Sequence, residues 1–231
     1  MLIERWHPVS SDLGLINAPA QASIDAFRAW YESIGIRYTL RTVTSSFADA
    51  LDLLPPLSAE ARRKIFVTTS SGWTAYFASG IAGSDPFPVM SALAKRLGVL
   101  AMRVCSSPHG AKWPAVIWEV YAPLELGGQA PLGCRRSIAA TNDGGRWVFE
   151  QSGEPFSFEQ LECYTRPRKR DRFTHELLSI YLANFGLAPF ADEFYAVSTS
   201  LPAFMLERVS RWDHIPPEFT LDQVLSGNPW R

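Results

Sequence analysis

Apolar side chains recur every three or four residues in three parts of the chain, which is the pattern of amphipathic helices. These parts are residues 18–34, 86–97 and 174–185. A proline lies near the first turn of the first two, and all three end next to a glycine, as helices commonly do. The pattern therefore predicts three helices that each bury one face.

Shorter helices are indicated by capping residues. Ser46 is followed three positions later by Asp49, and residues 157–160 and 220–223 have the Ser/Thr-x-x-Gln spacing of a capping box. We expect a short helix to begin at each of these places, the last one ending at Gly227. Residues 202–212 are also expected to be helical.

Segments rich in β-branched and aromatic residues predict strands in the middle of the chain. Besides residues 36–43, they form three pairs: 65–70 with 73–79, 99–105 with 115–121, and 136–141 with 146–151. The third pair surrounds the sequence Asn-Asp-Gly-Gly, whose glycines supply the positive φ angles that tight hairpins need. The short connections favour antiparallel pairing, because parallel strands need long crossovers.

The expected fold class is α+β, with a mainly antiparallel β-sheet over residues 65–151 that is covered by N-terminal and C-terminal helices. We expect residues 1–231 to form a single α+β domain. A minor N-terminal lobe over residues 1–56 stays open as an alternative, with its boundary at Pro55-Pro56.

Composition and charge narrow the environment. The chain has 231 residues, of which 47% are hydrophobic and 13% aromatic, and its formal net charge is −1. This balance creates no global attraction to nucleic acid or to an anionic membrane. Three widely spaced cysteines argue against a disulfide framework, and the uncharged stretch 65–84 is too rich in serine, threonine and glycine for a membrane span. We therefore expect a cytoplasmic protein with no membrane partner.

The sequence contains no recognisable motif for catalysis, metals or cofactors. Its four histidines are far apart, unlike zinc ligands, and no G-x-S-x-G elbow occurs. Cys105 and His109 are interpreted as a buried cysteine followed by a loop. Residues 80–84 are interpreted as a structural turn, because Asp85 is placed to cap the next helix and to repel a phosphate. Four glutamates within residues 150–162, including Glu159, are interpreted as a solvated, partly paired face. We expect no cofactor, no metal and no catalysis.

A basic turn at residues 166–172 (RPRKRDR) is the strongest local concentration of charge. It holds Arg166, Arg168, Lys169, Arg170 and Arg172 against a single aspartate. We interpret the turn first as a solvated connector, second as a protein-binding patch, and third as a nucleic-acid contact, for which Tyr164 alone offers base stacking.

Aromatic residues alternate along two predicted strands, so that neighbours face opposite sides of the sheet. Burial explains one face. The residues on the other face would form an aromatic and arginine surface of the kind enriched at protein interfaces. The expected pairs on that surface are Tyr76 with Arg146 or Trp113 with Trp118. Core packing is the favoured interpretation for any single aromatic residue. The candidate binding residues are Trp73, Tyr76, Arg146, Trp147, Tyr164, Arg166, Arg168, Arg170 and Arg172.

Three segments, 69–77 (TSSGWTAYF), 145–150 (GRWVFE) and 171–174 (DRFT), resemble those of a group of uncharacterised bacterial proteins of similar length. The resemblance covers most of the chain from residue 65 to residue 195. It implies bacterial and intracellular origin, and it assigns no activity, cofactor or catalytic residue.

The expected function is that of a non-catalytic cytoplasmic bacterial protein that binds another protein, as an accessory or immunity-like module. One alternative is a small-molecule-binding protein or enzyme with a pocket between sheet and helices, where polar groups would converge. A second alternative is an RNA-binding accessory protein that uses the basic turn at 166–172. A protein binder is expected to expose an apolar patch rimmed by charge.

Overall fold

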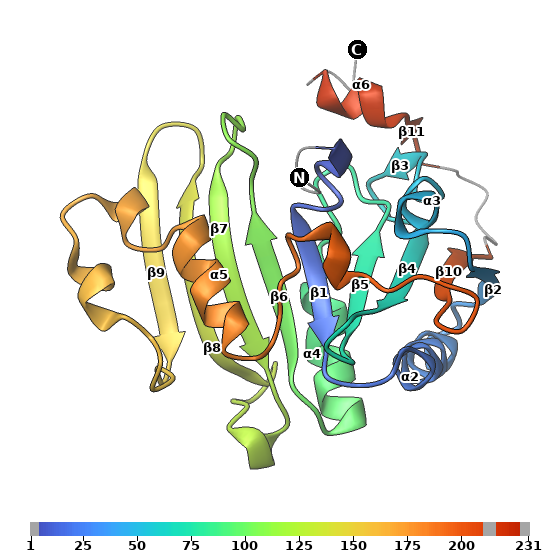
Figure 1. The fold of residues 1–231 in the computed structure, drawn as a ribbon, viewed down its shortest axis with the longest axis horizontal. Coiled ribbons are helices and arrows are strands. Elements are labelled where there is room, and N and C mark those ends of the chain that lie inside the picture. The colour runs from blue at the N-terminus through green and yellow to red at the C-terminus, as the bar shows by residue number, and fades with distance from the viewer. Residues whose placement is uncertain (1–4, 210–215, 227–231) are drawn as a thin grey trace.

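A nine-stranded antiparallel sheet forms the centre of the computed structural model, which describes residues 5–209 and 216–226 (Figure 1). From one edge to the other, the strands follow in the order β2-β10-β4-β5-β1-β6-β7-β8-β9. Their bounds are β1 Asp12–Ile16, β2 Tyr38–Val43, β4 Arg63–Thr68, β5 Thr74–Ala78, β6 Ala101–Ser106, β7 Ala115–Tyr121, β8 Cys134–Asn142, β9 Trp147–Gly153 and β10 Ala203–Arg208. A separate two-stranded sheet joins β3 (Leu57–Ser58) to β11 (Glu218–Phe219).

The α-helices begin after either a capping serine or threonine or a proline. Their bounds are α2 Ala20–Ser33, α3 Phe47–Leu51, α4 Phe87–Leu97, α5 His175–Ala183 and α6 Leu221–Leu225, with 3-10 helices η1 Leu124–Leu126, η2 Leu161–Thr165, η3 Lys169–Asp171 and η4 Asp192–Phe194. Ser46 caps α3 and Thr174 caps α5, while Thr220 and Gln223 form the predicted capping box of α6. The predicted stop at Gly227 lies outside the described residues. Over the described ranges, no helix is long and apolar enough to span a bilayer.

The three predicted hairpins are confirmed. β4 pairs with β5, β6 with β7, and β8 with β9, each in antiparallel register. Gly72 (φ 82°) and Gly144 (φ 106°) adopt positive φ angles in the turns of the first and third hairpins. A side chain is strained at such angles, so these glycines fix where the chain reverses.

The helix predicted over residues 202–212 is wrong. Residues Ala203–Arg208 form β10, which pairs with β2 on one side and β4 on the other, and residues 210–212 lie outside the described part. The sequence Ala-Phe-Met-Leu is apolar at consecutive positions, and such a run fits a strand buried on both faces as well as a helix. β1 is a further central strand that the sequence pattern did not indicate. The sheet therefore extends well beyond residues 65–151.

The helix predicted from the capping box at 157–160 does not form there. The 3-10 helix η2 begins only at Leu161, and its N-cap, Gln160, makes no side-chain capping bond. The Glu159 carboxylate instead accepts hydrogen bonds from Phe156 N and from Arg136 Nε, both at 2.9 Å. An ion pair to the sheet takes precedence over helix capping in this segment.

Two hydrophobic cores lie on opposite faces of the sheet, and β1 contributes to both. Leu13 and Leu15 belong to the core that includes residues of α3 and α5, while Ile16 belongs to the core that includes residues of α2 and α4. Figure 1 shows α5 in front of β7 and β8, with α4 behind β1 and β6. At Gly14, an added Cβ would lie 2.6 Å from Met90 Sδ, so a side chain at this position would push against α4.

The packing of α2 on the sheet can be tested at Phe27, which is fully buried against Tyr38, Phe66 and Tyr76. We predict that Phe27→Ala lowers the free energy of unfolding by about 3–5 kcal/mol, because it leaves a cavity, as measured by urea denaturation. The control Ile34→Ala, at a side chain that is 58% exposed, should change it by less than about 1 kcal/mol. Equal losses in the two variants would contradict the packing described here.

Candidate functional site

Two of the predicted binding residues are buried in the sheet. Trp73 is 7% exposed and lies in the core with α5, whereas Tyr76 is 1% exposed and lies in the core with α2 and α4. The predicted surface pairing of Tyr76 with Arg146 is wrong, because β1, β6, β7 and β8 separate β5 from β9, which begins after Arg146. Trp118 is also fully buried, so Trp113 lacks its expected partner on the surface. Core packing explains these aromatic residues.

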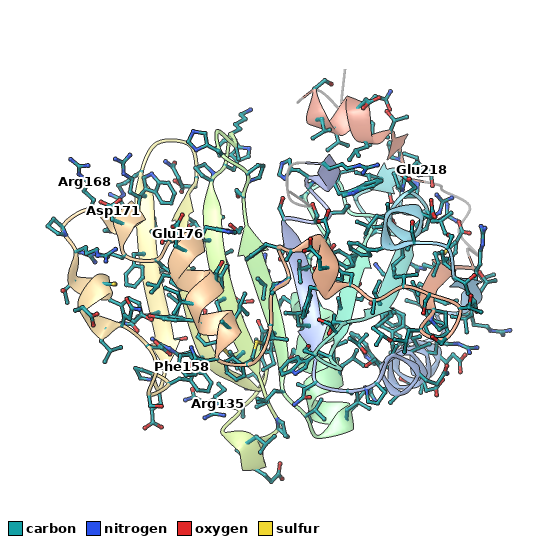
Figure 2. All side chains as sticks on the ribbon, in the orientation of Figure 1. Arg135, Phe158, Arg168, Asp171, Glu176 and Glu218 are labelled. Atoms are coloured by element: carbon teal, nitrogen blue, oxygen red, sulfur yellow. The ribbon has the colours of Figure 1, made fainter. Side chains whose placement is uncertain are left out.

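The basic turn folds back onto the edge strand β9. Arg166 Nη1 donates a hydrogen bond to Asp171 O (2.9 Å), and Arg172 Nε donates one to Arg166 O (2.7 Å). The Arg172 guanidinium also lies 5.6 Å from the centre of the Phe149 ring on β9. Two arginines thus fix the shape of the turn, and Figure 2 shows Arg168 and Asp171 at the outer side of β9.

The other basic side chains of the turn are directed to solvent. Arg168, Lys169 and Arg170 are exposed, and Arg170 Nε lies 3.5 Å from Asp171 Oδ1. Arg146 is likewise exposed in the turn before β9, and Trp147, the first residue of that strand, is half-buried. The 3-10 helix η3 contacts β9, so the basic turn and the start of this strand belong to one region of the surface.

Trp113 links the loop before β7 to the turn between β8 and β9. Its ring lies against Gly144, where an added Cβ would be 2.5 Å from Trp113 Cζ3. Trp113 is 54% exposed, and Lys112 Nζ lies 5.2 Å from its ring centre. Together with Pro114 and residues 141–143, it lines a shallow, mainly apolar hollow of 410 Å³.

Tyr164, another predicted binding residue, is buried in a polar network rather than exposed. Arg136 on β8 is 1% exposed and places Nη2 2.6 Å from Glu159 Oε2. Tyr164 Oη donates to the same oxygen (2.7 Å) and lies 2.9 Å from Tyr181 Oη on α5, which accepts a hydrogen bond from Gln160 N. The solvated face expected at Glu159 is therefore wrong. Because its groups bond to one another, this network supports the fold and leaves little for a ligand.

Cysteine and serine side chains are the usual nucleophiles of covalent catalysis, and Cys105 and Ser106 lie next to each other on β6. Cys105 is buried, and burial raises the pKa of its thiol, which keeps it protonated and unreactive. Ser106 Oγ lies 2.9 Å from His175 Nδ1, a pairing of strand and helix that the sequence did not indicate. Ser106 is only 1% exposed, and within the described residues no hydrogen bond joins the His175 ring to a carboxylate. No group of three or more metal-ligating side chains occurs within residues 5–209 and 216–226.

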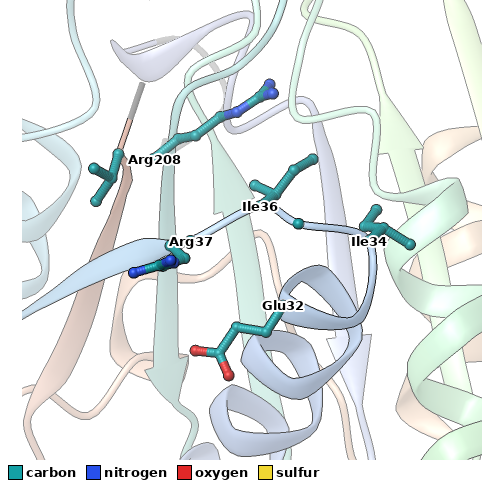
Figure 3. Close-up of a pocket in the computed structure, with 7 residues that line it drawn as sticks. Glu32, Ile34, Ile36, Arg37 and Arg208 are labelled. Atoms are coloured by element: carbon teal, nitrogen blue, oxygen red, sulfur yellow. The ribbon is translucent and has the colours of Figure 1, made fainter. Parts of the chain in front are cut away.

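A hollow of 970 Å³ lies where α2 gives way to β2. It is lined by Glu32, Ile34, Gly35, Ile36, Arg37, Arg208 and Val209. Figure 3 shows the Glu32 carboxylate and the Arg208 guanidinium pointing away from each other. The charged ends do not converge on a common point, so this hollow offers no defined chemistry.

Charged side chains do converge on a second cavity, of 380 Å³, lined by residues of the sheet, of α2 and of α4. Its lining includes Asp12 from β1, Lys64 from β4, Arg103 from β6 and the loop 80–85. Asp12 and Arg103 form two hydrogen bonds of 2.9 Å, and Arg103 Nη1 lies 3.6 Å from Glu119 Oε2. The charge of Arg103 is therefore fully compensated inside the protein.

Lys64 differs from Arg103, because no ion pair to it is formed in the described part of the chain. Lys64 is 6% exposed, and its ammonium donates a hydrogen bond to Ala61 O. Burial, together with repulsion from Arg208, lowers the pKa of Lys64 to about 7, while Asp85 opposes this shift. A lysine in this state is poised between its charged and neutral forms near neutral pH.

No sequence motif indicated this cavity, but charged residues within buried strands are a signal that could have revealed it. Asp12, Lys64 and Arg103 are charged positions in the mainly buried strands β1, β4 and β6, and each shares a face with a buried apolar residue of its own strand. Strand pairing brings Asp12, Lys64 and Arg103 together, and the sequence of a single strand does not reveal that pairing.

The helix cap predicted at Asp85 is wrong. The N-cap of α4 is Pro86, with no side-chain capping bond, and Asp85 has a φ of 39°.

Comparison with known proteins finds no relative of the chain. No family model matches it, and no curated protein and no solved structure is significantly similar to it.

The buried state of Lys64 predicts a pH-dependent stability. Because its folded pKa of about 7 lies below the ordinary value of 10.5, the unfolded chain binds one more proton between these pH values. The contribution of Lys64 to stability therefore rises with pH in this window, by up to about 1.4 kcal/mol per pH unit, and is most unfavourable below pH 7.

We predict that Lys64→Met stabilises the protein most strongly at pH 6–7, with the difference from wild type shrinking toward pH 9, in urea denaturation at each pH. Taking the difference removes the contributions of other titrating groups. Lys95→Met, at an exposed lysine on α4, serves as the matched control and should show no such trend. A pH-independent difference for Lys64→Met would mean that Lys64 titrates like a surface lysine.

Proposed function

We propose that this protein binds another protein, and that the binding surface is the basic end, defined as Lys112, Trp113, Arg146, Arg168, Lys169 and Arg170. The observation that carries the proposal is the internal use of Arg166 and Arg172. These two arginines hold the turn by hydrogen bonds to its own backbone and by contact with Phe149. The remaining basic side chains are thereby presented to solvent in a defined arrangement.

The charge of the basic end supports an acidic partner surface. The chain as a whole has a net charge of −1, yet five of the six residues of the basic end are cationic. The acidic residues beside these cations are Asp143, in the turn between β8 and β9, and Asp171, in the basic turn. Complementary charge at an interface accelerates association and selects the partner more than it adds affinity.

The basic end also offers an anchor of the kind found at protein interfaces. Trp113 is 54% exposed and borders the mainly apolar hollow of 410 Å³. Tryptophan and arginine are enriched among the residues that dominate binding energy, and an apolar centre with a charged rim is the common arrangement. The contact of Trp113 with Gly144 holds the ring in place before any partner binds, which reduces the entropy lost on binding.

A protein partner fits these residues better than RNA does. Tyr164, the predicted stacking residue of the basic turn, is buried, and Trp147 is half-buried. Base stacking would then depend on Trp113 alone, whereas RNA-binding surfaces stack successive bases on several aromatic side chains. From the resemblance of its three segments, we further propose that the chain acts in the bacterial cytoplasm as an accessory or immunity-like module.

Charge reversal of the turn tests this proposal. The variant Arg168→Glu/Lys169→Glu/Arg170→Glu should lose a stoichiometric protein that wild-type protein captures from lysate of its own organism. With the purified partner, the affinity should fall at least about tenfold, and the wild-type affinity should fall with added salt. Calorimetry or surface plasmon resonance measures both effects.

The matched control reverses the same number of exposed basic residues elsewhere, as Arg41→Glu/Lys95→Glu/Arg96→Glu. It should retain the partner. Equal capture by both variants would contradict the basic end as the binding surface. Recovery of nuclease-sensitive RNA, or of no stoichiometric protein by the wild type, would contradict protein binding itself.

A further inference from the structure

We propose that the 380 Å³ cavity beside Lys64 binds a small zwitterion with the charge pattern of a free α-amino acid, its carboxylate at Lys64 and its ammonium at Asp85. This site is separate from the basic end and would give the protein a second, small-molecule ligand. The charges of the cavity select this class of ligand, and its backbone and its size are compatible with it.

Most charged residues around the cavity form ion pairs with one another, but two of them do not. Asp12 neutralises Arg103 through two hydrogen bonds of 2.9 Å, and Glu60 Oε2 lies 3.4 Å from Arg208 Nη1. Lys64 and Asp85 form no ion pair within the described residues, although both line the cavity. Lys64 is buried, while Asp85 is exposed at the cavity mouth. A buried charge without a counter-charge is unfavourable, so a carboxylate delivered to Lys64 would remove an existing penalty.

The backbone around the cavity is strained at two positions. Ala61 (φ 45°) and Asp85 (φ 39°) are the non-glycine residues with positive φ in the described chain, and both line this cavity. Ala61 supplies the carbonyl that accepts from Lys64, and Asp85 carries the free carboxylate. Such conformations cost energy, and they concentrate where a protein holds groups in place for a ligand.

The balance of charge in the cavity restricts the class of ligand. Asp12 and Glu60 are already paired with Arg103 and Arg208, which leaves Lys64 and Asp85 as one positive and one negative charge. A ligand with one carboxylate and one ammonium matches both, whereas Asp85 would repel a phosphate dianion. The ammonium would lie beside Asp85 at the mouth, and Tyr31 and Tyr76 provide aromatic walls for an apolar side chain. A cavity of 380 Å³ has room for a molecule of this size.

The test uses the intact chain and the free amino acids as probes. Each of the twenty is added at roughly 10 mM, a concentration that detects dissociation constants up to the millimolar range, and the shift of the melting temperature is recorded. We expect at least one amino acid to raise it, with binding confirmed by calorimetry. For that amino acid, the N-acetyl derivative and the carboxamide each lack one charge and should bind at least tenfold more weakly to wild-type protein.

Two variants locate the site. Lys64→Met and Asp85→Asn should each weaken binding at least tenfold, while Lys95→Met retains it; circular dichroism checks that all three are folded. The charge-deleted ligands keep the test valid on wild-type protein if a variant fails to fold. Absence of binding by all twenty amino acids, equal binding of either charge-deleted derivative, or full binding by folded Lys64→Met would overturn the proposal.

Discussion

Arg136 and Glu159 form an ion pair that is almost completely shielded from water, and it ties the segment after β9 to strand β8. The same glutamate accepts from Phe156 N and Tyr164 Oη, and Tyr164 extends the network to Tyr181 on α5. A buried ion pair of this kind is stable only when further hydrogen bonds satisfy both partners, as they do here. The segment after β9 and helix α5 are thus held on the sheet by a polar contact as well as by apolar packing.

The same constraint, that a buried charge requires a partner, separates the structural from the functional groups. Arg136 and Arg103 are both compensated by carboxylates, and both connect elements of the fold. Lys64 has a backbone carbonyl and a cavity in place of a carboxylate. At the basic end, Arg166 and Arg172 bond to the turn itself, and the neighbouring cations Arg168, Lys169 and Arg170 are exposed to solvent. A charge that the protein itself does not compensate therefore indicates where a ligand can supply the missing partner.

Local features of the sequence predicted the hairpins and most helices, because a turn glycine or a capping serine acts within a few residues. Strands β1 and β10 were beyond such patterns: each is short and apolar on both faces, and β10 pairs with β2, more than a hundred and fifty residues away. The candidate sites divide in the same way. The basic turn is contiguous in sequence and was visible, whereas the Lys64 cavity is lined by residues of four strands, two helices and the loops between them. Glu159 was misassigned because its partner, Arg136, lies on strand β8, 23 residues earlier in the chain.

Lys64 is the central group of the cavity, because it is a buried lysine that forms no ion pair with the described residues. Its ionisation can be followed directly by NMR, through the ¹³C shift of the side-chain Cε as a function of pH in wild-type protein, with Lys64→Met used to assign the signal. The structure predicts a titration midpoint near pH 7. A midpoint near the ordinary lysine value of 10.5 would show that Lys64 is solvated or paired, and would contradict the account.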